Sequence, residues 1–307
     1  FFQAEDGIRD RSPSRGLGDV YKRQAVTLTS ILLGTVFFSY LFELYLELKE
    51  YSTPEEILLH IAPLGWVLVG LSMVELLATF GVRFYSTKFS EVKLSVQKLI
   101  TLHYLMNNIR VIKGNQIIWF SIWGTAIFWG MSQNLVAVIP ALAKVNLGVT
   151  SPLMVNAMLA LSILGIMVGA YVSARKSINS VKVNNIYTGS TTITVCAILV
   201  PVVATLSFIP NSTALIIVST LILLFGVGAG MMLVPLNALI QAHSAKDGLG
   251  GVIAGKNWIQ NMAMIGLLLL TVLLARSNVN SVYILYMNAL IAVVGFTVVL
   301  KRLKAIL

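Results

Sequence analysis

The sequence predicts an all-α polytopic membrane protein. Of its 307 residues, 57% are hydrophobic and only 11% are charged, and the mean hydropathy is +0.86. Soluble domains carry about 25% charged residues, so a chain this apolar needs lipid as its solvent. Backbone groups in hydrocarbon must be satisfied internally, which favours helices. We therefore expect a bundle of about eight transmembrane helices.

The first 24 residues are strongly polar, and continuous hydrophobic sequence begins at Ala25. Residues 3–10 and 16–24 each back-translate into the nucleotide sequence of a short-read sequencing adapter. We interpret residues 1–24 as an adapter-derived artefact and exclude them from fold reasoning, which implies that the 5′ part of the gene is missing. The alternative, a natural basic arm, would suggest binding to nucleic acid or anionic lipid.

Eight stretches are long and apolar enough to cross a bilayer, which takes about 20 residues in a helix. Breaks between them are marked by Pro54, Pro152, Pro210 and the glycine-rich stretch 248–251. The predicted spans are 25–42, 60–82, 115–143, 153–174, 186–209, 212–235, 251–275 and 280–300.

Lysine and arginine residues gather in alternate loops, which predicts the orientation of the spans. If the first span starts in the cytoplasm, the inner side holds Arg83, Lys88, Lys93, Lys98, Arg110, Lys113, Arg175, Lys176, Lys182, Lys246, Lys256, Lys301, Arg302 and Lys304. The outer side holds only Lys49, Lys144 and Arg276, beside several glutamates. Because positive charge is retained in the cytoplasm, both ends of the chain are expected there. The net charge of +10 then reports topology, and we expect no nucleic-acid partner.

The longest inner loop, about residues 84–114, mixes lysines with apolar residues near helical spacing, namely Val92, Val96, Ile100, Tyr104 and Leu105. This pattern predicts a basic cytoplasmic linker with an amphipathic helix on the inner leaflet.

Two spans, a long basic connection and six further spans resemble a twelve-helix transporter of the major facilitator superfamily without its first four helices. By this resemblance the chain has a partial superfamily fold equivalent to helices 5–12 of 12. Residues 25–83 would be the last two helices of the N-terminal bundle, 84–114 the linker, and 115–307 the C-terminal six-helix bundle.

Four segments carry a more specific resemblance. They are VPLNALIQ at 234–241, AGKNWIQNMAM at 254–264, GTAIFWG at 124–130 and LMVNAMLALSILGIMVG at 153–169. In order and spacing these segments look like the bacterial lysophospholipid transporter family. The chain departs from the family pattern at Gln260, where the family has a carboxylate, and at Lys256, where it has an amide.

The resemblance implies a secondary transporter, not an enzyme, that moves lysophospholipid across the bacterial inner (plasma) membrane for re-acylation. The implied substrate is similar to lysophosphatidylethanolamine, and the implied partner is a cytoplasmic acyltransferase, separate or fused. No cofactor and no metal are expected, because His60, His103, His243 and Cys196 lack metal-ligand spacing.

Two alternatives stay open. A drug or metabolite antiporter of the same superfamily ought to have a titratable residue deep in its cavity, and Glu75 is the one candidate. The membrane part of a fused acyltransferase protein is the other, although no catalytic constellation is seen in these residues.

Amide side chains at helical spacing are the candidate substrate-binding residues. Asn257, Gln260 and Asn261 stand at i, i+3 and i+4, which places three amides on one face, and Asn237 and Gln241 repeat the i, i+4 spacing. The remaining candidates are Gln133, Asn134, Asn156 and Lys256. Buried amides also commonly join helices, and Lys256 could bind a phosphate or extend to lipid headgroups.

Overall fold

A computed structural model describes residue 30 and residues 33–45, 54–81, 95–176, 183–245 and 248–307. These residues are mostly helical, and no strand occurs among them. The chain divides into two compact units, Phe1–Leu94 with Ser151–Asn156, and Ser95–Thr150 with Ala157–Leu307. Seven of the described helices are long and apolar enough to cross a membrane. The predicted all-α polytopic fold is thus confirmed.

The first unit contains an apolar helix, Leu33–Tyr45, followed by α2 (Pro54–Ile61) and α3 (Leu64–Phe80). The predicted span 60–82 corresponds to the spanning stretch Glu55–Phe80, in which a turn at residues 62–63 separates α2 from α3. Pro63 has no N–H to continue α2, but its fixed φ suits the position before a new helix. The predicted first span, 25–42, lies partly outside the described residues, as do Arg83, Lys88 and Lys93.

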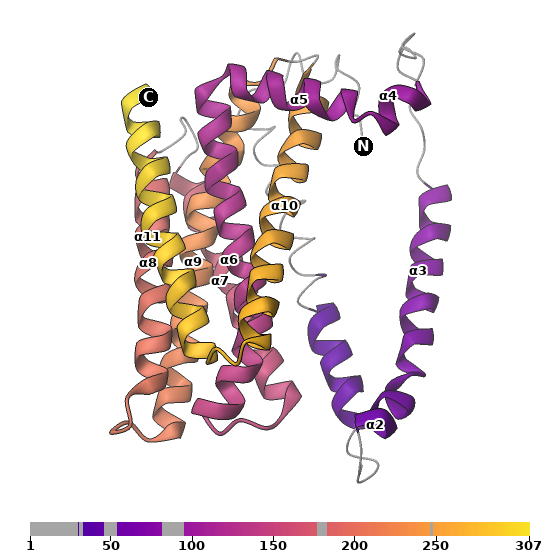
Figure 1. Cartoon of the computed structure of the whole chain (residues 1–307), viewed down its shortest axis with the longest axis vertical. Helices are drawn as coiled ribbons and strands as arrows, with labels where there is room; N and C mark the ends of the chain where they lie inside the picture. Colours follow the sequence, from indigo (N-terminus) through magenta and orange to yellow (C-terminus); the bar gives the residue numbers. More distant parts are fainter. Residues whose placement is uncertain (1–29, 31–32, 46–53, 82–94, 177–182, 246–247) are drawn as a thin grey trace. The chain divides into compact units, whose positions relative to one another are not determined.

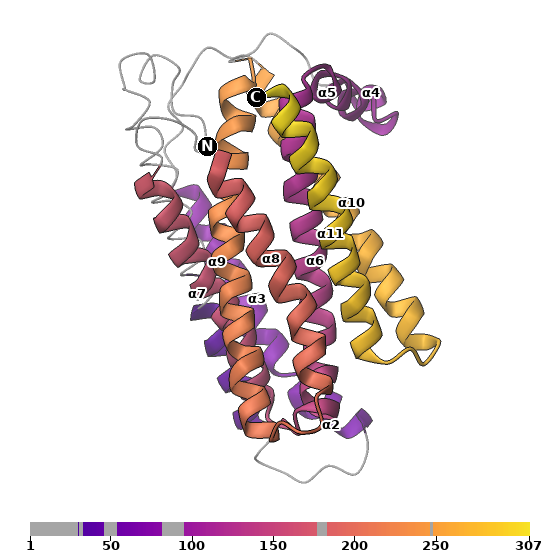
Figure 2. The ribbon, with the colours of Figure 1, turned by 90° about the vertical axis from the view of Figure 1, so that its left-hand side faces the viewer.

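The second unit is a helical bundle with two short helices across one end (Figure 1). Its helices are α4 (Val96–Ile100), α5 (His103–Gly114), α6 (Gln116–Asn146), most of α7 (Pro152–Lys176), α8 (Val183–Thr205), α9 (Asn211–His243), α10 (Leu249–Arg276) and α11 (Ser281–Ile306). The central helix is α6, which packs against α9, α10 and α11, while α8 packs against α9 and α11. Figure 2 shows these helices from the side.

Each proline that was predicted to break the chain, at 54, 152 and 210, lies at or directly before a helix start, but one predicted span end is wrong. The chain breaks at Pro152 and Pro210, yet α9 continues past Pro235 to His243 instead of ending at residue 235. Pro235 removes one backbone hydrogen bond. The following turns stay helical because Leu236, Leu239 and Ile240 are buried in the bundle.

The glycines of α9 mark close helix packing. A Cβ at Gly226 or Gly230 would overlap the α7 backbone, and a Cβ at Gly165 or Gly169 of α7 would overlap α9. Gly228 faces the other way, where its Cβ would lie 2.7 Å from a backbone oxygen of α8. Small residues that let backbones touch are how helices gain contact in lipid. Helix α9 is thus held between α7 and α8.

The linker helix is present in part. Residues 82–94 lie outside the described part of the chain, and the remainder forms α4 and α5, separated at Leu102, whose φ is 55°. The side chain of Asn115 then accepts hydrogen bonds from the backbone N–H groups of Ile117 (3.0 Å) and Ile118 (3.3 Å). This cap begins α6 directly after α5.

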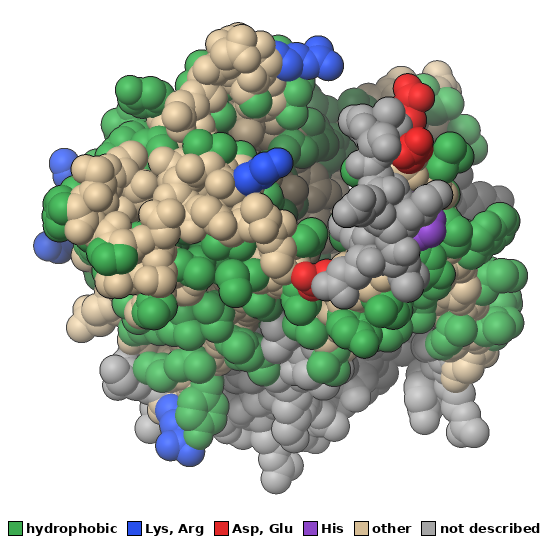
Figure 3. Space-filling model, turned by 90° about the horizontal axis from the view of Figure 1, so that it is seen from below, with side chains coloured by type: hydrophobic (Ala, Val, Ile, Leu, Met, Phe, Trp, Pro, Cys, Tyr) green, Lys and Arg blue, Asp and Glu red, His purple; other side chains and the backbone are tan. Residues whose placement is uncertain are grey.

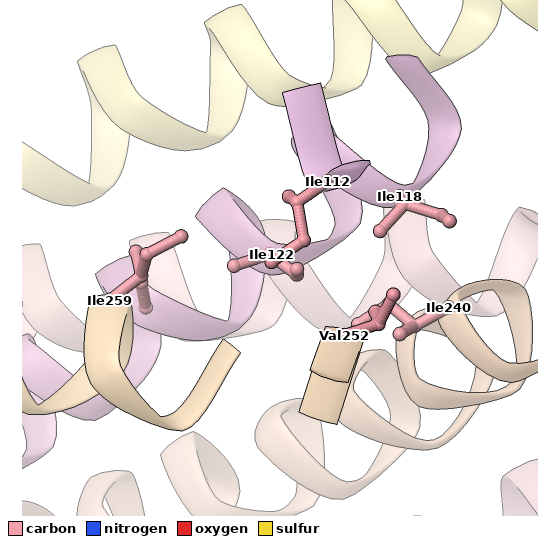
Figure 4. Close-up of a cluster of buried hydrophobic side chains, with 7 residues drawn as sticks. Ile112, Ile118, Ile122, Ile240, Val252 and Ile259 are labelled. Carbon is pink, nitrogen blue, oxygen red and sulfur yellow. The ribbon is translucent and has the colours of Figure 1, made fainter. Parts of the chain in front are cut away.

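Helix α5 is seated on two glycines of α10. A Cβ at Gly251 would lie 2.7 Å from Oδ1 of Asn108, and a Cβ at Gly255 would lie 2.5 Å from Cδ1 of Ile112. The absence of side chains at these glycines lets α5 approach. Helices α5, α6, α9 and α10 share one apolar cluster (Figure 4), whose members are Ile112, Ile118, Ile122, Ala126, Ile240, Val252 and Ile259.

Charge is distributed unevenly between the two ends of the second unit. At the end that carries α5 and the C-terminus of α11, the described basic residues are Lys98, Arg110, Lys113, Arg175, Lys176, Lys301, Arg302 and Lys304. At the other end they are Lys144 and Arg276, and the surface seen from there consists mostly of hydrophobic and uncharged atoms (Figure 3). The second unit contains no Asp or Glu among its described residues.

Candidate functional site

The three amides of α10 do not share one environment. Gln260 is buried and points into the bundle, whereas Asn257 and Asn261 are exposed on the same helix. The one-turn spacing of Asn257 and Asn261 keeps these two on a common stripe, with Met264 partly buried one turn further. The structure therefore brings two of the three predicted amides together on the surface of the second unit.

Beside this stripe lie large apolar side chains. Trp258 is 40% exposed, Met262 is 43% exposed and Ile265 is 56% exposed. The open face of α10 is thus amphipathic, with amides along one edge. In a membrane-spanning helix, exposed amides are costly against hydrocarbon, so we expect them to face a polar path or another part of the protein.

Lys256 and Asn237 join α10 to α9. The Lys256 ammonium donates a hydrogen bond to Asn237 Oδ1 (2.5 Å), and both side chains are partly buried. Each residue lies about 10 Å from the nearer end of its helix, at about 1.5 Å rise per residue. The lysine therefore bonds sideways to the neighbouring helix instead of extending toward the helix end. Gln241 follows Asn237 by one turn and is exposed.

Asn134 takes part in an interhelical hydrogen bond. It is fully buried in α6, and its Oδ1 lies 2.9 Å from the hydroxyl of Thr271 in α10. Asn288 of α11 is also buried and donates from Nδ2 to the backbone oxygen of Met131 (3.2 Å). These bonds connect the three helices. Sequence reasoning did not single out Thr271 or Asn288, although a polar residue in each apolar helix was a visible signal.

The remaining predicted substrate-binding residues in the described part of the chain are Gln133, Asn156 and Gln260. Gln133 is partly buried in α6, next to Asn134. Asn156 is partly buried in the early turns of α7, in a segment that groups with the first unit. Gln260 has a buried Nε2 with no hydrogen-bond partner in the described part of the chain. A buried amide donor without a partner costs about 1–3 kcal/mol, so this group is available to a ligand or a water molecule.

Groups that could titrate or bind metal are sparse. Where the structure describes the chain, no three His, Cys, Asp or Glu side chains gather in an arrangement that could hold a metal ion. Glu75 is exposed on α3 in the first unit, and Cys196 is buried in α8.

Comparison with known proteins agrees with the family resemblance of the sequence segments. No family model matches the chain, and no solved structure matches it. Curated proteins named Lysophospholipid transporter LplT, from Salmonella paratyphi B, Salmonella newport and Salmonella heidelberg, are 36% identical to it over 150 residues. The match covers 48% of this chain and 34% of each relative, so the chain is similar to these transporters over about a third of their length.

Proposed function

We propose that this chain is part of a secondary transporter that moves a lysophospholipid across the bacterial inner membrane. The similarity to curated lysophospholipid transporters carries the proposal. Seven helices of spanning length and hydropathy support it, because such helices fit a multi-pass membrane protein. We assign the chain to helices 5–12 of a major facilitator superfamily fold, with the second unit as the C-terminal bundle.

The substrate has one acyl chain and a charged headgroup, so its path must be polar on one side and apolar on the other. The open face of α10 has this composition, since Asn257 and Asn261 lie beside Trp258, Met262 and Ile265. The amides would contact the headgroup, while the apolar side chains would contact the tail. A uniformly polar pore would exclude the tail.

Alternating access requires that each half move as a body around the substrate. The helices of the second unit are packed closely enough to move together as one body. Glycine contacts lock α9 against α7 and α8, and buried hydrogen bonds connect α6, α10 and α11. A bundle packed in this way transmits movement at one face to the others.

The predicted orientation indicates which end of the second unit faces the cytoplasm. Positive residues gather at the end that carries α5, which favours the cytoplasm for that end. Lysophospholipid delivered to the inner leaflet would then meet a cytoplasmic acyltransferase, separate or fused, for re-acylation.

The test is uptake of radiolabelled lysophosphatidylethanolamine by spheroplasts that lack their own carrier and express the complete gene. We expect saturable uptake that falls in Asn257→Ala and Asn261→Ala variants. Asn107→Ala is the matched control, because it removes an exposed amide from α5 instead of α10. No uptake above background, together with uptake of a drug or sugar, would refute the lipid function in favour of an antiporter.

A further inference from the structure

The Lys256 ammonium has an unusual electrostatic position in the second unit. It lies within the span of α10, is partly buried, and donates a hydrogen bond to a neutral amide oxygen, that of Asn237. Among the described residues of the second unit, no Asp or Glu is present to neutralise it. A cation inside a membrane bundle is costly without an anion. The unit is therefore electrostatically complementary to an anionic ligand at this place.

The hydrogen-bonding groups point to the same chemistry. An ammonium has three N–H donors, and one of them is used by Asn237 Oδ1. That bond also occupies the acceptor of Asn237 and turns its Nδ2 donors away from the lysine. The pair thus offers N–H groups from two helices, which suits an oxyanion.

The position of Lys256 is set by its neighbours. Gly255 precedes it and packs beneath Ile112 of α5, where an added Cβ would lie 2.5 Å from Ile112 Cδ1. Val252 and Ile259, on the same helix, are buried in the apolar cluster that α5 completes. These contacts fix the rotation of α10 so that Lys256 faces α9.

We propose that Lys256 and Asn237 form an oxyanion cradle that anchors the phosphate of the transported lipid. The inference rests on the proposed function, because a phosphodiester is the anionic group that every lysophospholipid carries. Lys256 supplies the charge, and Asn237 both positions the ammonium and donates from Nδ2. Asn257 and Asn261 lie on the exposed face of the same helix, at about the same height as Lys256 or one turn further on.

The decisive variant is Asn237→Asp. A carboxylate at this position can accept the same hydrogen bond, so the α9–α10 contact is retained and strengthened by charge. It also neutralises the lysine, which removes the attraction for phosphate. If the bond between Lys256 and Asn237 is only structural, Asn237→Asp should leave thermal stability unchanged or higher and should leave transport unchanged. The cradle predicts retained stability with a KM for lysophosphatidylethanolamine raised by about tenfold or more, the equivalent of one lost charge-assisted hydrogen bond.

Further variants separate charge from packing in the same uptake assay. Lys256→Arg keeps the charge and is expected to retain most transport, whereas Lys256→Met is expected to match the Asn237→Asp defect. Lys144→Met is the control, since it removes an exposed lysine from the other end of the unit. An unchanged KM in both Asn237→Asp and Lys256→Met would overturn the cradle.

Uptake by the unmodified protein tests the proposed function, and uptake by the variants tests this inference. If the unmodified protein takes up no lysophospholipid, the proposed function fails and the cradle fails with it. If it takes up lysophospholipid, the cradle alone is tested by the variants. Uptake of monoacylglycerol, which lacks phosphate, is expected to be low and insensitive to Asn237→Asp. Inorganic phosphate is expected to compete weakly; saturation by phosphate alone would assign the cradle to the free anion and overturn its assignment to the lipid.

Discussion

Replacement of Gly226 by alanine tests the close packing of α9 against α7. The added Cβ would fall on the backbone carbonyl of Ser162, far inside the 3.4 Å at which ordinary van der Waals contact begins. Backbone cannot rotate away as a flexible side chain can. The two helices must therefore separate, by roughly 1 Å, and such a gap forfeits about a quarter to a half of the dispersion energy of the contacts that it opens.

Overpacking of this kind typically costs about 1–3 kcal/mol of stability. We expect the upper end of this range, because the atoms that the new Cβ meets belong to the backbone of α7. For a unit of this size, 1 kcal/mol shifts Tm by about 2–4 °C. Gly226→Ala should then lower Tm by about 6–12 °C. The assay is thermal unfolding of the purified protein in detergent, followed by helical circular dichroism.

The matched control is Gly266→Ala in α10, where an added Cβ would meet nothing within 4 Å. Alanine is a better helix former than glycine by about 1 kcal/mol, so this variant should be neutral or slightly more stable. Equal Tm values for the two variants would refute the packing argument.

Three further predictions concern other contacts of the second unit. Thr271→Val should lower stability by about 0.6–2 kcal/mol, because it removes the interhelical hydrogen bond to Asn134; thermal unfolding measures it. Gly255→Leu should displace α5 from α10, because its side chain would occupy the space of Ile112; limited proteolysis should then cut near α5 faster. A cysteine at Ser277, between α10 and α11, should react with a membrane-impermeant thiol reagent added outside intact cells, because that turn is predicted to be extracytoplasmic.

Each of these predictions has a contrasting variant. Thr220→Val removes an exposed hydroxyl that bonds only its own helix, at the oxygen of Ile216, and should leave Tm nearly unchanged. Gly266→Leu should leave α5 in place and its protease sensitivity unaltered. A cysteine at Lys304 should react only after the membrane is permeabilised, and labelling of it from outside would contradict the predicted orientation.

The helices themselves were largely predictable from composition. Seven spans appear near their predicted places because a bilayer sets a length of about 20 apolar residues that any spanning helix must meet. The boundaries at Pro152 and Pro210 followed from the missing N–H of proline. The predicted span 212–235 ended too early, because burial of the residues after Pro235 keeps α9 helical to His243. The predicted amphipathic linker helix was divided at Leu102, which no residue pattern signalled.

The candidate site was less predictable. Helical spacing placed Asn257, Gln260 and Asn261 on one face, but only the neighbours of α10 decided that Gln260 is buried while the other two are exposed. Spacing within one helix also cannot show which amide meets a second helix, as Asn134 does with Thr271.

What the sequence by itself determined is therefore the need for a lipid environment, the approximate limits of seven of the eight predicted spans, and the similarity to known transporters. These depend on local properties, because hydropathy, helix length and backbone freedom belong to short segments. The tertiary structure alone decided that Lys256 turns to Asn237, and that α5 rests on Gly251 and Gly255. Such contacts join residues distant along the chain, and their geometry depends on how neighbouring helices rotate and approach when they pack.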